Sequence, residues 1–242
     1  MQEKIRYWLK FPIGIILMFP VFLFSGCESK YLEPDEEMLG FSYFPLTIGS
    51  FRIYEVMDIK YTIQNTKDST FYYLKEVVKD SFINQEGHLS HYLYRFTRTS
   101  DTLPWDQIPV YIWITRKTDT NLIVYEENVP FVKLTFPVKS GLSWNGNALN
   151  TLDPLDYYYS EPDLSLLSSY IPENHLIQVV QNNFDDLIIR RDVRNEIYAE
   201  NIGLVYKESN VLEYCQDLIC RGQQIIESGT EYRQTLVEYG KE

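Results

Sequence analysis

The sequence predicts an all-β protein, an antiparallel meander that forms an open (half) barrel or a sandwich, preceded by an N-terminal signal helix. Three observations favour this fold class. Tyrosine and phenylalanine are abundant while alanine is scarce, which is typical of strands. Apolar and polar residues alternate with a period of two over many short segments. No long segment carries the 3.6-residue apolar repeat of an amphipathic helix.

Segments of alternating polarity follow one another from residue 43 onward. Residues 51–63 have an apolar side chain at every odd position except Glu55, which predicts a half-buried strand whose odd-numbered face lies in the core. Residues 153–170 are expected to form a long loop or a short helix. Turn-forming residues separate the segments, as in an antiparallel meander. Further strands are expected at 71–79, 91–98, 110–115, 121–125, 131–136, 176–180 and 187–191.

The first 26 residues have the pattern of an export signal. A basic start is followed by the apolar run 11–24, which is shorter than the roughly 20 apolar residues that a membrane span needs. Small residues, Ser25-Gly26, then precede Cys27 directly. This arrangement resembles the lipobox of bacterial lipoproteins, which implies that Cys27 is acylated and becomes the first residue of the mature protein. A transmembrane helix and an ordinary cleaved signal are the alternatives, and the position of Cys27 argues against the second.

The expected organisation is a signal peptide at 1–26, an acidic tether at 27–42 and a single β-rich domain at 43–242. Removing the signal takes away three basic residues and one acidic residue, so the net charge of −12 becomes −14. Nucleic acid and anionic lipid repel so acidic a body, so we expect no nucleic-acid partner. The expected contact with an outer membrane is the lipid on Cys27, because two or more acyl chains anchor a protein stably.

Three motifs in the body resemble those of uncharacterised, lipid-anchored, β-rich lipoproteins of the Bacteroidota. They are a Phe-Pro-Leu turn with a glycine and an aromatic strand at 43–56, the segment 134–147, and the segment 198–208. The resemblance implies a lipid-anchored β body and no particular reaction. Acidic residues behind Cys27 also resemble the surface-export signals of such lipoproteins. The cluster at 35–37 comes late, however, so the periplasmic and cell-surface faces both stay open.

The two remaining cysteines, Cys215 and Cys220, are separated by four residues. In an oxidising compartment a close pair usually forms a disulfide, and this spacing suits the tip of a hairpin between 204–214 and 223–227. A metal site would need two further ligands, and none of the three histidines has ligand spacing to these cysteines. We therefore expect a disulfide, no metal and no cofactor.

The residues give little sign of catalysis, and we expect no catalytic residue. The sequence has no Gly-x-Ser-x-Gly elbow, no His-Glu-x-x-His, no phosphate-binding glycine loop and no calcium-loop pattern. His88 and His91 lie beside a predicted turn at Gly87, where we expect solvent-exposed histidines. Glu126-Glu127 and Asp185-Asp186 could supply a glycosidase pair if their carboxyl groups lay about 5–9.5 Å apart. The alternative of a glycan-acting hydrolase therefore stays open. Three tryptophans could line a sugar-binding platform or fill the core: Trp105, Trp113 and Trp144.

Two short segments, 68–70 and 101–103, resemble the O-glycosylation sequon of Bacteroidota secreted proteins, which makes Ser69 and Thr102 candidate glycosylation sites in expected loops. Taken together, the sequence predicts a non-enzymatic binding or interaction module of the cell envelope. Its ligand would be an apolar molecule or a glycan held on the concave face of the sheet, or its outer face would bind an envelope partner. A purely structural envelope protein is the remaining alternative.

Overall fold

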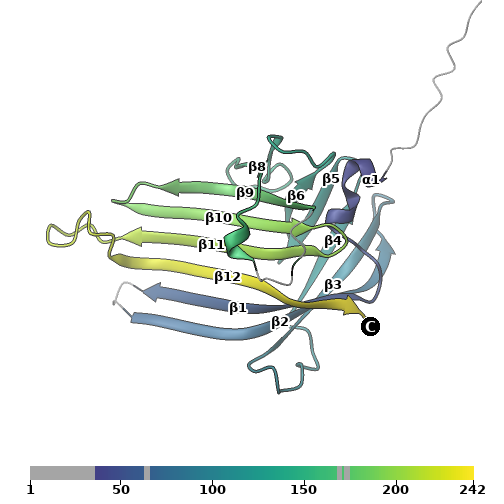
Figure 1. Cartoon of the computed structure of the whole chain (residues 1–242), viewed down its shortest axis with the longest axis horizontal. Coiled ribbons are helices and arrows are strands. Elements are labelled where there is room, and N and C mark those ends of the chain that lie inside the picture. The colour runs from purple at the N-terminus through teal and green to yellow at the C-terminus, as the bar shows by residue number, and fades with distance from the viewer. Residues whose placement is uncertain (1–35, 63–65, 168–170, 172–174) are drawn as a thin grey trace, which may run out of the picture. The chain divides into compact units, whose positions relative to one another are not determined.

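The computed structural model describes residues 36–62, 66–167, 171 and 175–242 (Figure 1). The chain divides into residues 1–33 and 34–242, and everything described belongs to the second unit. The predicted signal peptide and Cys27 lie outside the described residues. None of the helices in the described part is long and apolar enough to cross a membrane.

The described residues form a single antiparallel sheet, which confirms the all-β prediction. A short helix α1 (Glu36–Leu39) and two 3-10 turns, η1 (Phe41–Tyr43) and η2 (Leu164–Leu166), accompany it. The strands are β1 (Ser50–Thr62), β2 (Thr66–Ile83), β3 (Leu89–Arg98), β4 (Tyr111–Lys117), β5 (Asn121–Glu126), β6 (Val129–Thr135), β7 (Ser143–Asn145), β8 (Asp156–Ser160), β9 (Leu176–Asp185), β10 (Arg190–Ala199), β11 (Gly203–Tyr214) and β12 (Ile226–Lys241).

Two meanders meet in the middle of the sheet, whose order is β6-β5-β4-β3-β2-β1-β12-β11-β10-β9-β8-β7. The strands β6 and β7 are successive in sequence, yet they form the two edges. In a flat sheet of twelve strands the edges would lie about 50 Å apart. The seven residues 136–142 that join these strands span at most about 29 Å, so the sheet must curl.

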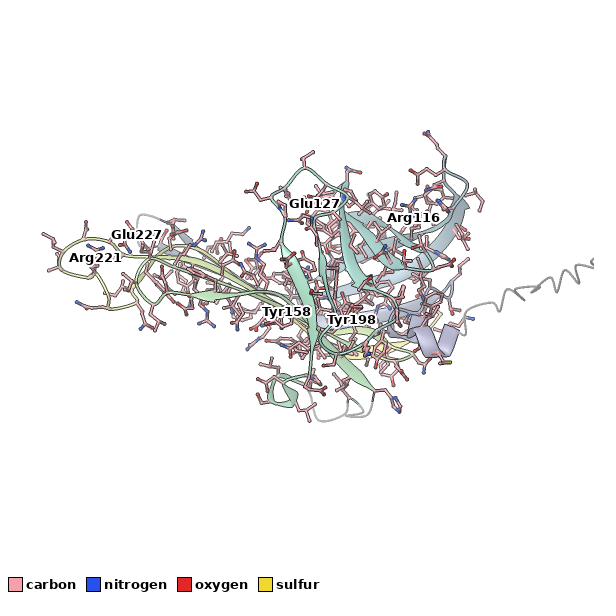
Figure 2. The ribbon with its side chains drawn as sticks, turned by 90° about the horizontal axis from the view of Figure 1, so that it is seen from above. Arg116, Glu127, Tyr158, Tyr198, Arg221 and Glu227 are labelled. Carbon is pink, nitrogen blue, oxygen red and sulfur yellow. A yellow bond between two sulfur atoms is a disulfide. The ribbon has the colours of Figure 1, made fainter. Side chains whose placement is uncertain are left out.

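The curled sheet almost closes into a barrel, as the open-barrel prediction requires. Its edges are joined by hydrogen bonds, because the Val132 amide donates to the Gly146 carbonyl at 2.9 Å and Trp144 Nε1 donates to the Val132 carbonyl at 2.8 Å. Beyond the closed part, the strands β1, β2 and β9 to β12 continue side by side as an extended sheet (Figure 1). Figure 2 shows Arg221 and Glu227 at the end of this extension, far from Arg116 and Glu127.

Most of the predicted strands are present, and two expectations are wrong. Residues 187–191 are mainly the turn before β10, where Asp186 accepts hydrogen bonds from three successive backbone amides and so favours a turn over a strand. The segment 153–170 contains the unexpected strand β8 beside η2, because the alternation of buried and exposed tyrosines at 157–159 is strand-like.

The odd-numbered face of β1 does not supply the core in the way its pattern predicts. The even-numbered residues Arg52, Tyr54 and Val56 are buried, at 1%, 0% and 3% exposure. On the opposite face Ile53 and Ile59 are buried as well. Because the sheet curls around the even-numbered side, an arginine in the polar half of the pattern becomes an interior residue.

The cysteine prediction is confirmed. Cys215 and Cys220 form a disulfide in the loop between β11 and β12, at the end of the hairpin. The Cys215 amide donates to the Ile225 carbonyl at 2.8 Å, so the loop is closed at its base as well. A cross-link over so short a segment stabilises the fold by about 2 kcal/mol, mainly by restricting the unfolded chain.

Candidate functional site

The interior of the curled sheet contains an arginine triad, which we define as Arg52, Glu76 and Arg95. These residues are direct cross-strand neighbours on β1, β2 and β3. Arg52 Nη2 donates to Glu76 Oε1 at 3.0 Å, and Arg95 Nε lies 3.6 Å from Glu76 Oε2. All three side chains are at most 8% exposed. One carboxylate therefore serves two buried guanidinium groups.

The backbone around Arg52 is shaped to accept its side chain. Arg52 Nη1 donates to the Ile202 carbonyl at 3.1 Å, and the Phe44 ring covers the guanidinium at 5.0 Å. Gly203 has a φ of +101°, and a Cβ built on it would lie 2.6 Å from Arg52 Nη1. Only glycine adopts this conformation readily and also leaves room for the arginine.

A second group of charges, the lysine quartet, lies beside the arginine triad and consists of Glu126, Lys133, Glu196 and Lys207. Lys133 Nζ contacts Glu196 Oε1 at 2.5 Å and Glu126 Oε1 at 3.0 Å. Lys207 Nζ lies 3.4 Å from Glu196 and 3.6 Å from Glu126. Lys133 and Glu196 are buried, whereas Glu126 and Lys207 are partly exposed. Each carboxylate contacts two ammonium groups, which offsets the cost of removing these charges from water.

The pKa shifts follow from this arrangement. Burial alone would raise the pKa of the Glu126 carboxyl, but Lys133 and Lys207 outweigh it and lower the pKa to about 2. The same ammonium groups hold the pKa of Glu196 below its usual value against the effect of burial. Burial would lower the pKa of Lys133, and the two carboxylates raise it instead. All three side chains are therefore charged at neutral pH.

The depressed pKa of Glu126 predicts how stability depends on acid. A carboxyl with a folded pKa below its unfolded value stabilises fully above about pH 4.3, and the stabilisation is lost as the pH falls toward the folded pKa of about 2. The urea midpoint should therefore fall over this window. A Glu126→Gln variant should be less stable at pH 7 and lose less on acidification, so the two curves converge near pH 2. Parallel curves would contradict the assignment.

The strands β2, β3, β4 and β12 border a pocket of about 430 Å³, which we call the tyrosine pocket. Three tyrosines from three strands line it, Tyr72 on β2, Tyr111 on β4 and Tyr232 on β12, and Arg95 reaches it from the arginine triad. Tyr232 donates to Gln234 Oε1 at 2.8 Å, and burial raises the pKa of Tyr72 and of Tyr232. The remaining lining residues are Thr70, Leu74, Thr97, Arg98, Thr99, Leu103, Pro104, Asp106 and Val110.

Residues 99–110 form one wall of this pocket and are held in place by the strands. Thr97 donates its hydroxyl to Asp106 Oδ2 at 2.7 Å, while the Asp106 amide donates to the Thr97 carbonyl at 3.1 Å. Farther along, the Val110 amide donates to the Arg95 carbonyl at 2.8 Å. The Arg98 guanidinium lies over the Trp105 ring at 4.3 Å. The wall is thus attached at several points along β3.

The carboxylate pairs considered from sequence lie in different places. Glu126 belongs to the lysine quartet, Glu127 is exposed on a turn, and Asp186 caps the turn before β10. Glu126 and Glu196 do meet: both contact one ammonium group, at 3.0 and 2.5 Å, so these oxygens are at most 5.5 Å apart. This upper limit is compatible with the carboxyl separation of about 5–5.5 Å in a retaining glycosidase. However, both pKa values are lowered, and the adjoining cavity of about 20 Å³ holds about one water.

The tryptophans do not form a platform together. Trp113 lies under Arg95 in the interior, 3.7 Å from the guanidinium to the ring centroid, and Trp144 closes the seam between β6 and β7. Trp105 lies in the segment 99–110 against Arg98 and is not among the residues that line the tyrosine pocket. His88 is exposed in the turn before β3, as expected, whereas His91 is buried and its pKa is lowered by burial and by Lys117.

The two candidate glycosylation sites differ in their surroundings. Thr102 is exposed in the loop 99–110, as expected. Ser69 is also exposed, but it lies within β2, paired with Ile59, so the expectation that it lies in a loop is wrong. The long hairpin of β1 and β2 continues through this segment because threonines and an exposed phenylalanine extend the strand pattern to residue 66.

Sequence reasoning missed the interior charges. Lys133 stands between Val132 and Leu134 on β6, and all three of these residues are buried. Glu196 stands on β10 directly before the buried residues 197–199. For Lys133 the available signal was an apolar neighbour on each side, whereas Glu196 has an apolar neighbour, Ile197, on one side only. No such signal exists for the tyrosine pocket, because its three tyrosines are distant in sequence.

No protein-family model matches the chain, and no curated protein matches it either. The chain is similar to a crystal structure of a Bacteroides fragilis protein that is described as exported and as having a YmcC-like fold. The identity is 11%, the TM-score is 0.38, and the match covers 82% of this chain and 98% of that one. A likeness at this level carries no information on what this chain binds, and its function has to be argued from its own residues.

Proposed function

We propose that the protein is a lipid-anchored, non-enzymatic binding module of the cell envelope whose tyrosine pocket takes a glycan. The observation that carries the proposal is the composition of that pocket. Tyrosine rings offer flat apolar faces on which sugars stack, and their hydroxyls donate hydrogen bonds to sugar oxygens. Threonine hydroxyls, Asp106 and Arg95 add further polar partners at its edges and base.

A purely apolar ligand suits this pocket less well than a glycan. An apolar ligand is usually enclosed, with most of its surface buried. The tyrosine pocket is open, and Tyr111 is 44% exposed at its rim. An open pocket with aromatic faces fits a chain molecule such as an oligosaccharide, which can extend past both ends.

Exchange of the exposed tyrosine tests the glycan proposal directly. Tyr111→Ala should weaken oligosaccharide binding about fivefold, because one stacking contact is worth on the order of 1 kcal/mol, while folding is little affected at so exposed a site. Calorimetric titration with envelope oligosaccharides measures the affinity. Tyr239→Ala is the matched control, since Tyr239 is 46% exposed and lies outside the pocket.

Three results would count against this assignment. Equal loss of affinity in both tyrosine variants would place the glycan elsewhere. Release of shortened oligosaccharides during the titration would favour the glycan-acting hydrolase over a binding module. Absence of binding across all oligosaccharides tested would favour the purely structural alternative.

The anchor is proposed to be the lipid on Cys27, which would hold the body at the outer membrane. The argument rests on the basic, apolar and small-residue pattern that precedes Cys27. Cys27→Ser should move the protein from the detergent phase to the aqueous phase when envelopes are partitioned, because acyl chains are its expected means of membrane attachment. The Cys215→Ser, Cys220→Ser double variant is the control and should stay in the detergent phase. Continued detergent partitioning of Cys27→Ser would contradict the anchor.

A further inference from the structure

The arginine triad carries an excess positive charge in the interior. The lysine quartet is neutral as a whole, with two ammonium groups and two carboxylates. The triad has two guanidinium groups and one carboxylate, so one positive charge is not neutralised. A lysine or histidine in such a position could release its proton, but an arginine cannot. The compensation has to come from another group.

Besides Arg52 Nε, three buried N–H groups around this excess charge make no hydrogen bond to the described residues. They are Arg95 Nε, which lies 3.6 Å from Glu76 Oε2, Trp113 Nε1 and Gln234 Nε2. Gln234 is 1% exposed and Arg95 is 7% exposed. The orientation of the Gln234 amide follows from its oxygen, which accepts hydrogen bonds from Tyr232 at 2.8 Å and from Arg95 Nη2 at 3.4 Å. Its Nε2 is thereby left as a donor.

All three of these residues line a single small cavity of about 20 Å³. A cavity of that size holds one water or one monatomic ion. The three carboxylates that also line it, Glu76, Glu126 and Glu196, are each in contact with two cations. The cavity is therefore lined by three residues with unpaired donors, lies beside an excess positive charge, and has room for a single small ligand.

We propose that this cavity is a binding site for one small monovalent anion of the halide class, chloride under ordinary conditions. A halide accepts hydrogen bonds from several donors at once and needs no acceptor in return. A water oxygen has two lone pairs, so it cannot accept a full hydrogen bond from each of three donors. The anion also neutralises the excess charge of the arginine triad, which a water does not.

The site is distinct from the proposed glycan site but touches it. Arg95 lines both the small cavity and the tyrosine pocket, whereas Trp113 and Gln234 line only the cavity. The anion would fix the Arg95 side chain from the interior. Binding of the anion does not depend on whether the tyrosine pocket takes a glycan.

The direct test is a crystal of the mature protein grown in sodium bromide, with data collected at the bromine absorption edge. An anomalous peak within hydrogen-bond distance of Arg95, Trp113 and Gln234 is expected. A peak only at the surface, or ordered water alone in the cavity, would overturn the proposal. This measurement needs no variant, so it does not depend on whether an altered interior still folds.

A solution test uses melting temperature at constant ionic strength, with sodium bromide replacing sodium methanesulfonate. The melting temperature should rise by about 2–4 °C once bromide exceeds its dissociation constant about fivefold, and it should follow single-site saturation. Gln234→Glu supplies a carboxylate inside the site and should abolish the bromide response. Gln181→Glu is the matched control, because Gln181 Nε2 is also buried and unpaired while Gln181 does not line the cavity. A bromide response in Gln234→Glu equal to that of the unaltered protein would refute the assignment.

Discussion

Replacing Lys133 by methionine should lower the free energy of unfolding by about 3–5 kcal/mol, the usual cost of removing one partner from a buried ion pair. Lys133 is 6% exposed and is the closest cation to both Glu126 and Glu196. Methionine fills a similar volume, so the loss measures charge rather than packing. After the change, two buried carboxylates share Lys207 alone.

Urea denaturation of Lys133→Met at pH 7 measures this effect. Lys139→Met is the matched control, since Lys139 is exposed in the connection between β6 and β7, and it should leave the midpoint almost unchanged. An equally small change in Lys133→Met would mean that Lys207 alone neutralises the two carboxylates.

The deficit of the Lys133→Met variant should shrink in acid. In the unaltered protein the two lysines lower the pKa of Glu126 and of Glu196, so these carboxyls stay charged until the pH falls well below 4. Without Lys133, burial dominates and raises both pKa values. In the variant, Glu126 and Glu196 then become protonated at a higher pH, which removes the repulsion between their two negative charges. The unaltered protein, in contrast, loses stability as the pH falls. The free energies of unfolding of the variant and of the unaltered protein should therefore approach each other below about pH 4.

The sequence predicts the local features of this protein well. Alternation identifies β1 to β6, and the spacing of Cys215 and Cys220 predicts a disulfide at a hairpin end. Each of these depends on residues close together in the chain. Even so, alternation alone did not reveal that even-numbered residues of β1 are buried beside Ile53 and Ile59, because the burial of Arg52 depends on which way the whole sheet curls.

The candidate sites could not be predicted in the same way. Lys133 and Glu196 are 63 residues apart, and Arg95 and Gln234 are 139 apart. They meet only because β12 pairs with β1 and the edges of the sheet join. A charged residue in a strand is usually solvated, so a single sequence favours the exposed interpretation for each of them. The order of the strands is what brings the charges together, and no local pattern specifies that order.

Replacing Glu76 by glutamine should be as costly as the loss of Lys133, again about 3–5 kcal/mol. Glutamine keeps the shape and a hydrogen-bond acceptor but removes the carboxylate that Arg52 and Arg95 share. Two guanidinium groups then remain buried without a counter-charge, and neither can release its proton. The Ile202 carbonyl, Gln234 Oε1 and the rings of Phe44 and Trp113 are among the partners left to them.

Glu86→Gln is the matched control for Glu76→Gln, because Glu86 also pairs with an arginine, Arg116, but its side chain is 66% exposed. Water screens that pair, so its loss should change the urea midpoint little. The contrast isolates burial as the cause, since the chemistry of the two substitutions is the same. If Glu76→Gln were equally mild, the aromatic rings and the carbonyl would be sufficient to hold two buried arginines, and the excess charge of the triad would need no further compensation. A large loss instead shows that each positive charge in this interior requires a negative one.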